Sequence, residues 1–276
     1  MSTLAVAKKD FLDVRRAKIV WFVSSLYVLI AVLMFYFGQN NTENPEFYYA
    51  LTGLTGNGAM ILTLVALVTA YLAIAGERES GSIKYMLSIP NSRRDVVLGK
   101  FLTRSAVVVG SILVGFGIGA VLGVLWYPSV DVEMFLGALA LTILFTLTYV
   151  SVAIGISAAT ASRSRAMGGT IGFFFVTTVL ALFRMVSFAL DWVLNDLLGL
   201  ELSQNALTFI EALMSPIMAF SGAIELVFPD QAAQAAQSAA ETPWYLEGET
   251  MVVILLAWLI VPLVLGIWRF ERADLG

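Results

Sequence analysis

Long apolar runs separated by short polar segments dominate this chain of 276 residues. A helix needs about 20 mainly apolar residues to cross a bilayer, and six runs reach that length. They lie at about residues 19–38, 54–75, 97–125, 134–161, 168–190 and 250–268. Because lipid offers no hydrogen-bond partner to an exposed backbone, helices are the expected form of such runs. The pattern therefore predicts an all-α polytopic membrane protein with six transmembrane helices.

The first polar segment, residues 1–18, has a helical pattern of its own. Its apolar residues recur at spacings of three and four, at Leu4, Ala7, Phe11 and Val14, with charged residues between them. This period is typical of an amphipathic helix that lies in a membrane interface. The alternative is a solvated basic leader to the first span, and the apolar stripe favours the interfacial helix.

The segment at 191–249, between the fifth and sixth spans, is the longest polar connection. Loops of such length without structure of their own are uncommon. Its apolar pattern predicts one or two short helices at the outer membrane surface, with a break at Pro216. Residues 231–240 are low in complexity and predict a mobile connection or a weak exposed helix. We expect one membrane domain over residues 1–276, with no nucleotide-binding domain.

The distribution of charge predicts the orientation. Of the 16 Lys and Arg residues, 15 fall in segments on one side of the predicted spans, and Arg184 is the exception. Positively charged loops stay in the cytoplasm. We therefore predict a multi-pass protein of the cell membrane with both termini and the segment 76–96 in the cytoplasm. Arg184 is expected to snorkel to the outer interface with Asp191 as its partner, and a role in the transport path is the alternative.

Composition excludes several kinds of site. The chain has no Cys and no His, which removes thiol chemistry, Ser-His catalysis and the commonest transition-metal ligands. Met214 and Met218 are four apart, a spacing more typical of packing than of a metal site. The pair Gly99-Lys100 lacks the neighbouring Gly and Ser or Thr of a phosphate-binding loop. We therefore expect no catalytic residue, no metal site and no cofactor bound by this chain.

Small residues predict where helices approach one another closely. Gly115, Gly119 and Gly123 lie four apart on one face of the third span, a spacing that lets membrane helices pack closely. Gly168 and Gly172 repeat this spacing in the fifth span. Such faces allow a dimer without requiring one.

The segment 76–96 concentrates charge in a chain with only 13% charged residues. Glu77 and Glu79 suit the start of a short helix, because acidic groups complement the positive end of a helix dipole. Ile83 and Leu87 share one face of that helix and need a surface to bury on. A proline three residues later ends the helix. An ordinary solvated loop is the alternative interpretation.

In full, this segment and the start of the next span read GERESGSIKYMLSIPNSRRDVVLGK, residues 76–100. The stretch resembles the loop between spans two and three of type-2 ABC transporter permeases, where an acidic pair, a Gly, an apolar stretch, a Pro, a basic residue and a Gly-Lys pair follow one another. The matching residues are Glu77, Glu79, Gly81, Ile83, Leu87, Pro90, Arg93 or Arg94, and Gly99-Lys100. In that family the loop forms a coupling helix that docks on the ATPase, and the resemblance implies the same role here.

The resemblance implies the permease subunit of an ATP-driven exporter. A separate P-loop ATPase would bind ATP and Mg, so this chain would not itself be an enzyme. A second permease copy or paralogue, in a homodimer or heterodimer, would complete the path across the lipid bilayer. No nucleic acid is expected among the partners. The substrate stays open. One branch of the family serves maturation of copper-containing nitrous-oxide reductase, and whether this chain belongs to that branch stays open as well.

Two other functions remain as alternatives. An ion-coupled secondary transporter usually carries charged residues near the membrane midplane, and the predicted spans have almost none. A non-transporting membrane subunit would relay ATPase movements to an envelope partner. The sequence does not separate that subunit from a permease.

Overall fold

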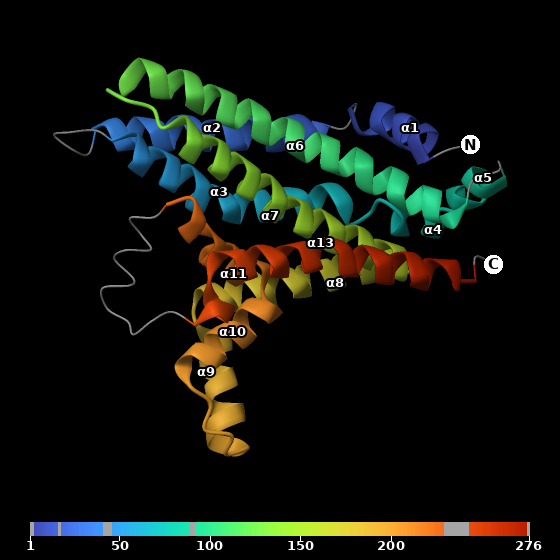
Figure 1. Cartoon of the computed structure of the whole chain (residues 1–276). Coiled ribbons are helices and arrows are strands. Elements are labelled where there is room, and N and C mark those ends of the chain that lie inside the picture. Colours follow the sequence, from blue (N-terminus) through green and yellow to red (C-terminus); the bar gives the residue numbers. More distant parts are fainter. Residues whose placement is uncertain (1–2, 16–17, 41–45, 89–91, 229–242, 275–276) are drawn as a thin grey trace.

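The computed structural model describes residues 3–15, 18–40, 46–88, 92–228 and 243–274, and helices make up most of them (Figure 1). The first half contains α1 (Thr3–Arg15), α2 (Lys18–Asn40), α3 (Phe47–Ala70), α4 (Ala75–Glu79), α5 (Ser82–Ser88) and α6 (Arg93–Trp126). The second half contains α7 (Val132–Ala159), α8 (Arg163–Phe174), α9 (Met185–Asp191), α10 (Gln204–Met214), α11 (Pro216–Ala223) and α13 (Gly248–Glu271). Two π-helical segments, η1 (Phe175–Leu180) and η2 (Trp192–Leu197), extend α8 and α9, and η3 (Ile224–Leu226) and η4 (Trp244–Leu246) are short 3-10 turns. The low-complexity stretch 231–240 lies outside the described residues.

These helices confirm the predicted all-α membrane fold. Within the described chain, four helical segments are long and apolar enough to cross a membrane alone: Phe47–Glu79, Arg93–Trp126, Val132–Ala159 and Gly248–Glu271. Two bent pairs, Arg163–Leu180 with Met185–Leu197 and Gln204–Met214 with Pro216–Leu226, raise the number to six if each pair counts as one span. The first predicted span corresponds to α2, in which Ser24–Asn40 is a shorter apolar helix.

The predicted fifth span, 168–190, differs from the expected continuous helix. Its two parts are bent by 82°, and Arg184 at the break has a left-handed backbone with φ of 57°. Residues with a side chain seldom adopt this conformation, and α9 begins directly after it. The expected pairing of Arg184 with Asp191 is not found among the described residues. The Asp191 carboxylate instead accepts a hydrogen bond from Asn195 Nδ2 at 2.8 Å.

Short helices also occur in the segment after η2. α10 and α11 meet at a bend of 117°, and Pro216 is the first residue of α11. Proline is favoured at that position because its missing N–H would have no partner within the helix. Ser215, at the bend, is buried and donates a hydrogen bond to the Thr177 carbonyl of η1. The bend therefore lies against the broken fifth span.

The glycine face of α6 packs against aromatic rings of the same chain. A Cβ atom added to Gly115 would lie 2.5 Å from the ring of Tyr27 on α2, and one added to Gly123 would lie 2.6 Å from the ring of Phe47 on α3. Gly119, between them, faces the ring of Phe35 on α2 in the same way. The three small residues thus let α2 and α3 approach α6 closely.

Both ends of the chain lie at one end of the bundle, together with α1, α4 and α5 (Figure 1). α1 lies directly on α6, because a Cβ added to Gly99 would come within 2.8 Å of Val6 Cβ. At the other end, the Tyr127 hydroxyl donates a hydrogen bond to the Phe35 carbonyl at 2.7 Å. Burial raises the pKa of Tyr127 to about 12, so this hydroxyl stays a donor at neutral pH.

Candidate functional site

Three consecutive residues of α4 are each tied to a different helix. Glu77 Oε1 forms an ion pair with Lys100 Nζ of α6 at 2.7 Å. Arg78 Nη1 donates to the carbonyls of Ala158 at 3.1 Å and Thr160 at 2.8 Å, at the end of α7. Because α4 turns by about 100° per residue, neighbouring side chains point in different directions, which lets one short helix reach several others.

Glu79 makes the third tie, to the beginning of α8. Its Oε2 accepts a hydrogen bond from the Arg163 backbone N–H at 2.6 Å, and its Oε1 lies 3.8 Å from Arg163 Nε. Arg163 is the first residue of α8. The first N–H groups of a helix lack partners within it and carry its positive dipole end. The Glu79 carboxylate therefore caps α8 from another part of the chain.

The link between α3 and α4 is also fixed against α7. Ser157 Oγ accepts hydrogen bonds from the backbone N–H groups of Ile74 and Ala75, both at 3.0 Å. The Arg78 guanidinium lies 5.7 Å from the ring centre of Phe270 on α13, a distance at which a cation is attracted to an aromatic face. α4 thus contacts the ends of α7 and α13 as well as α6 and α8.

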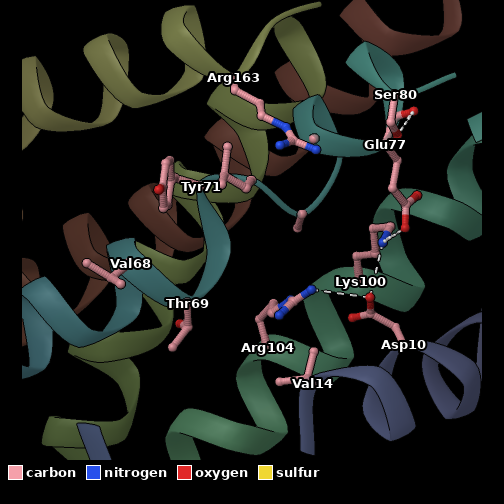
Figure 2. A pocket seen from close by; sticks show the side chains of 13 residues that line it. Asp10, Val14, Val68, Thr69, Tyr71, Glu77, Ser80, Lys100, Arg104 and Arg163 are labelled. Carbon is pink, nitrogen blue, oxygen red and sulfur yellow. Dashed lines mark hydrogen bonds and ion pairs between the residues drawn. The ribbon is translucent and has the colours of Figure 1, made fainter. Parts of the chain in front are cut away.

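A buried ion network joins the same site to α1. Lys100 is 1% exposed, and its Nζ lies 3.1 Å from Asp10 Oδ1 in addition to its contact with Glu77. Arg104 Nη2, one turn further along α6, lies 3.2 Å from the same Asp10 oxygen. Two acidic and two basic side chains therefore share one network between α1, α4 and α6 (Figure 2). An opposite charge at this distance offsets part of the cost of burying each ion.

The predicted coupling residues on α5 have different surroundings from one another. Gly81, with φ of 75°, makes the turn from α4 to α5, a conformation that favours glycine. Ile83 is 1% exposed and belongs to the core of this chain, and Leu87 packs against that core in a half-buried position. This chain therefore provides the surface that Ile83 was expected to need, and the role of Ile83 in coupling to the ATPase stays a prediction. Pro90 lies outside the described residues.

Arg93 belongs to the first turn of α6 and reaches the end of α13. Its Nη1 donates to the carbonyls of Phe270 at 2.7 Å, Glu271 at 3.0 Å and Ala273 at 2.6 Å. These carbonyls lie at the carboxyl end of α13, which is the negative end of its dipole. Arg93 thus caps α13, a contact within this chain.

Sequence reasoning missed several residues of this site. Asp10 and Arg104 escaped notice because their partners lie more than 90 positions away or on another helix, so no local pattern marks them. Arg78 was counted only as a positive charge. Tyr85, which is 80% exposed on α5, was overlooked between the apolar positions. The alternation of Glu77, Arg78 and Glu79 was the one signal that could have indicated ties in several directions.

A cavity of about 620 Å³ opens beside the ion network. Its charged wall is formed by Asp10, Glu77, Lys100, Arg104 and Arg163, and its apolar wall by residues of α1 and the end of α3 (Figure 2). Within the residues that the structure describes, no three Asp or Glu side chains are grouped to hold a metal ion.

The fold and the site define a multi-pass membrane protein in which one short helix is tied to several spans. The sequence profile of the ABC-2 family transporter proteins matches residues 4–275. The chain belongs to this family of ABC transporter permeases, in which ATPase activity resides in a separate nucleotide-binding subunit.

Two curated relatives carry the name probable ABC transporter permease protein NosY. The protein of Pseudomonas aeruginosa is 29% identical over 180 residues, 62% of this chain and 66% of the relative. The protein of Stutzerimonas stutzeri is 28% identical over 132 residues, 47% of this chain and 48% of the relative. The matched regions thus cover less than two thirds of each relative's own length.

Proposed function

We propose that this chain is the permease subunit of an ATP-driven exporter of the cell membrane, with both termini in the cytoplasm. A separate P-loop ATPase, which binds ATP and Mg, docks on the surface formed by α4 and α5. One observation carries the proposal: Glu77, Arg78 and Glu79 tie α4 to α6, α7 and α8 respectively. A displacement of this one short helix would be passed to three spans together.

The contacts support a rigid transmission. Directional hydrogen bonds and ion pairs resist sliding more than apolar contacts do, and Lys100 is almost fully buried where it meets α4. The same Lys100 holds Asp10 of α1. We infer that α1 and α4 move as one unit with the amino-terminal part of α6.

The docking surface is proposed to be the exposed side of α5. Ile83 anchors α5 to the core of the chain, while Tyr85 on the other side is 80% exposed. Tyrosine is enriched among the residues that contribute most to protein interfaces, because a large flat ring loses little conformational entropy on binding. Tyr85 is therefore our strongest candidate contact for the ATPase, with Gly81 fixing the angle between α4 and α5. Leu87 and Pro90 remain proposals for this surface.

A second copy or a paralogue is proposed to complete the path. Aromatic rings of the same chain occupy the space beside Gly115, Gly119 and Gly123, so this face of α6 is not open to a partner. Gly168 and Gly172 on α8 have no atom within 4 Å of an added Cβ. This face of α8 leaves room for close approach by another helix.

The docking proposal is tested by purifying the tagged full-length chain from its native membrane in mild detergent. We expect a stoichiometric P-loop ATPase in the wild-type preparation. Tyr85→Ala should reduce its recovery about tenfold, as loss of a central aromatic contact does. Trp244→Ala is the matched control, because Trp244 is a 72% exposed aromatic residue elsewhere in the chain. Absence of any ATPase, or equal recovery with Tyr85→Ala, would contradict the proposal.

Transmission is tested in the same complex with a single cysteine. The chain has no native Cys, so Met167→Cys, at a 47% exposed position of α8, provides one labelling site. We expect ATP to change its rate of labelling. Glu79→Ala should remove this ATP dependence while the ATPase stays bound, because it deletes the oxygens that contact Arg163 at the start of α8. An unchanged ATP response in Glu79→Ala would show that Glu79 does not transmit the movement.

A further inference from the structure

The cavity beside the ion network contains buried polar atoms that the network leaves unused. Asp10 Oδ2, Glu77 Oε2 and Arg104 Nε each lack a hydrogen-bond partner among the described residues. Asp10 is only 7% exposed. Leaving a buried polar group without a partner is costly. Each of these atoms has less than 1 Å² of accessible surface although its residue lines the cavity, so a ligand gains two acceptors and one donor when these side chains turn toward it.

The charges of the network select the kind of ligand. Asp10 and Glu77 are balanced by Lys100 and Arg104, and Arg163 is balanced by Glu79, which lies 3.8 Å from it. A ligand with a net charge would disturb this balance. A ligand that carries both a positive and a negative group would meet the free acceptors with one end and the free donor with the other.

The opposite wall of the cavity is apolar and continues along a span. Val68 lines the cavity and is 45% exposed. Leu64 and Met60, four and eight residues before it on α3, are 41% and 43% exposed. Residues at this spacing lie on one helix face and extend over about 12 Å. Val68 thus joins the cavity to an exposed apolar track along α3.

We propose that this cavity binds a phospholipid whose headgroup carries a primary amine and a phosphate. The ammonium donates hydrogen bonds to Asp10 Oδ2 and Glu77 Oε2, and the phosphate accepts from Arg104 Nε and from the Arg163 guanidinium (Figure 2). An acyl chain lies along the apolar track of α3. A quaternary ammonium has no N–H and fails to satisfy the two carboxylate oxygens. The site therefore prefers an ethanolamine headgroup over a choline headgroup of equal charge.

This lipid would connect elements that move in the proposed cycle, since the cavity is lined by α1, α3, α4, α6 and α8. Its binding, however, does not depend on that cycle. The site needs only the folded chain and a membrane lipid. It is tested without ATP, without an ATPase and without knowledge of the substrate.

The test uses the full-length chain, purified and stripped of lipid in detergent. Native mass spectrometry measures binding of phosphatidylethanolamine, its N-monomethyl and N,N-dimethyl forms, and phosphatidylcholine, all with the same acyl chains. We expect affinity to fall with each methyl group, to about tenfold weaker for choline, the equivalent of ~1.4 kcal/mol. Equal affinity across the series would overturn the proposal, and this comparison requires no mutation.

Variants locate the site. Asp10→Asn and Glu77→Gln should each reduce the preference for ethanolamine, because an amide replaces one charged acceptor. Glu271→Gln is the control, since this residue pairs with Arg94 and does not line the cavity. A preference that survives both cavity variants would place the lipid elsewhere and refute this site.

A competition experiment distinguishes binding of a lipid from binding of a soluble phosphate ester. Glycerophosphoethanolamine has the same headgroup but no acyl chains, and we expect it to compete poorly with the lipid. Competition as strong as that of the lipid itself would show that the apolar track contributes nothing. That result would overturn the assignment of a lipid.

Discussion

Removing Lys100 should destabilise the fold strongly, because the side chain is buried between two carboxylates. It is 1% exposed and lies 3.1 Å from Asp10 and 2.7 Å from Glu77. Lys100→Met keeps most of the volume and removes the charge. Breaking a buried ion pair by deleting one partner costs about 3–5 kcal/mol. Asp10 keeps Arg104, and Glu77 is 27% exposed, so we expect the lower end, about 3 kcal/mol.

The measurement is unfolding by sodium dodecyl sulfate in mixed micelles, followed by tryptophan fluorescence. A double-mutant cycle with Glu77→Gln isolates the pair, and we expect the two changes to couple by about 0.5–3 kcal/mol. Glu271→Gln is the control, because its partner Arg94 is 67% exposed, and should leave the unfolding midpoint unchanged. A loss below about 1 kcal/mol for Lys100→Met would match an exposed pair and refute the buried network.

Two further predictions use the same measurement of unfolding by sodium dodecyl sulfate. Gly115→Leu should destabilise by about 1–3 kcal/mol through overpacking, because its Cβ would lie 2.5 Å from the Tyr27 ring. Gly117→Leu is the matched control on α6, since an added Cβ there has no atom within 4 Å, and equal effects would contradict the packing. Arg184→Gly should be neutral or stabilising by up to about 1 kcal/mol, because glycine accepts the left-handed backbone without strain. A loss of stability in Arg184→Gly would show that the side chain itself holds the bend.

The spans were predictable because a bilayer imposes a length and a composition on any segment that crosses it. The bend at Arg184 was not, since neither Gly nor Pro marks it in the sequence. The helix ends there through the left-handed backbone of one arginine, a residue type that rarely adopts this conformation. The break at Pro216 was predictable, because proline has a fixed place at the start of a helix.

The segment 76–96 was predicted to contain one short helix before Pro90, whereas the structure has two, α4 and α5, and its role in coupling stays a prediction. Ile83 was assigned to coupling through the resemblance to the permease family, and as an apolar residue among polar ones it was expected to need a surface to bury on. The structure buries it in the core of the same chain. Only three-dimensional contact distinguishes these outcomes, because an apolar residue in a polar loop has the same local pattern in both.

The arrangement of charges around α4 follows from the geometry of helix ends. Arg78 meets the carbonyls that end α7, Glu79 meets the N–H groups that begin α8, and Arg93 meets the carbonyls that end α13. Each side chain has the sign that the helix dipole favours at that end. Since caps of this kind bind backbone atoms, they hold the helix axis rather than one of its side chains. A movement of α4 that preserves these contacts must therefore carry the ends of α7 and α8 with it, whereas apolar contacts at the same positions would allow the helices to slide.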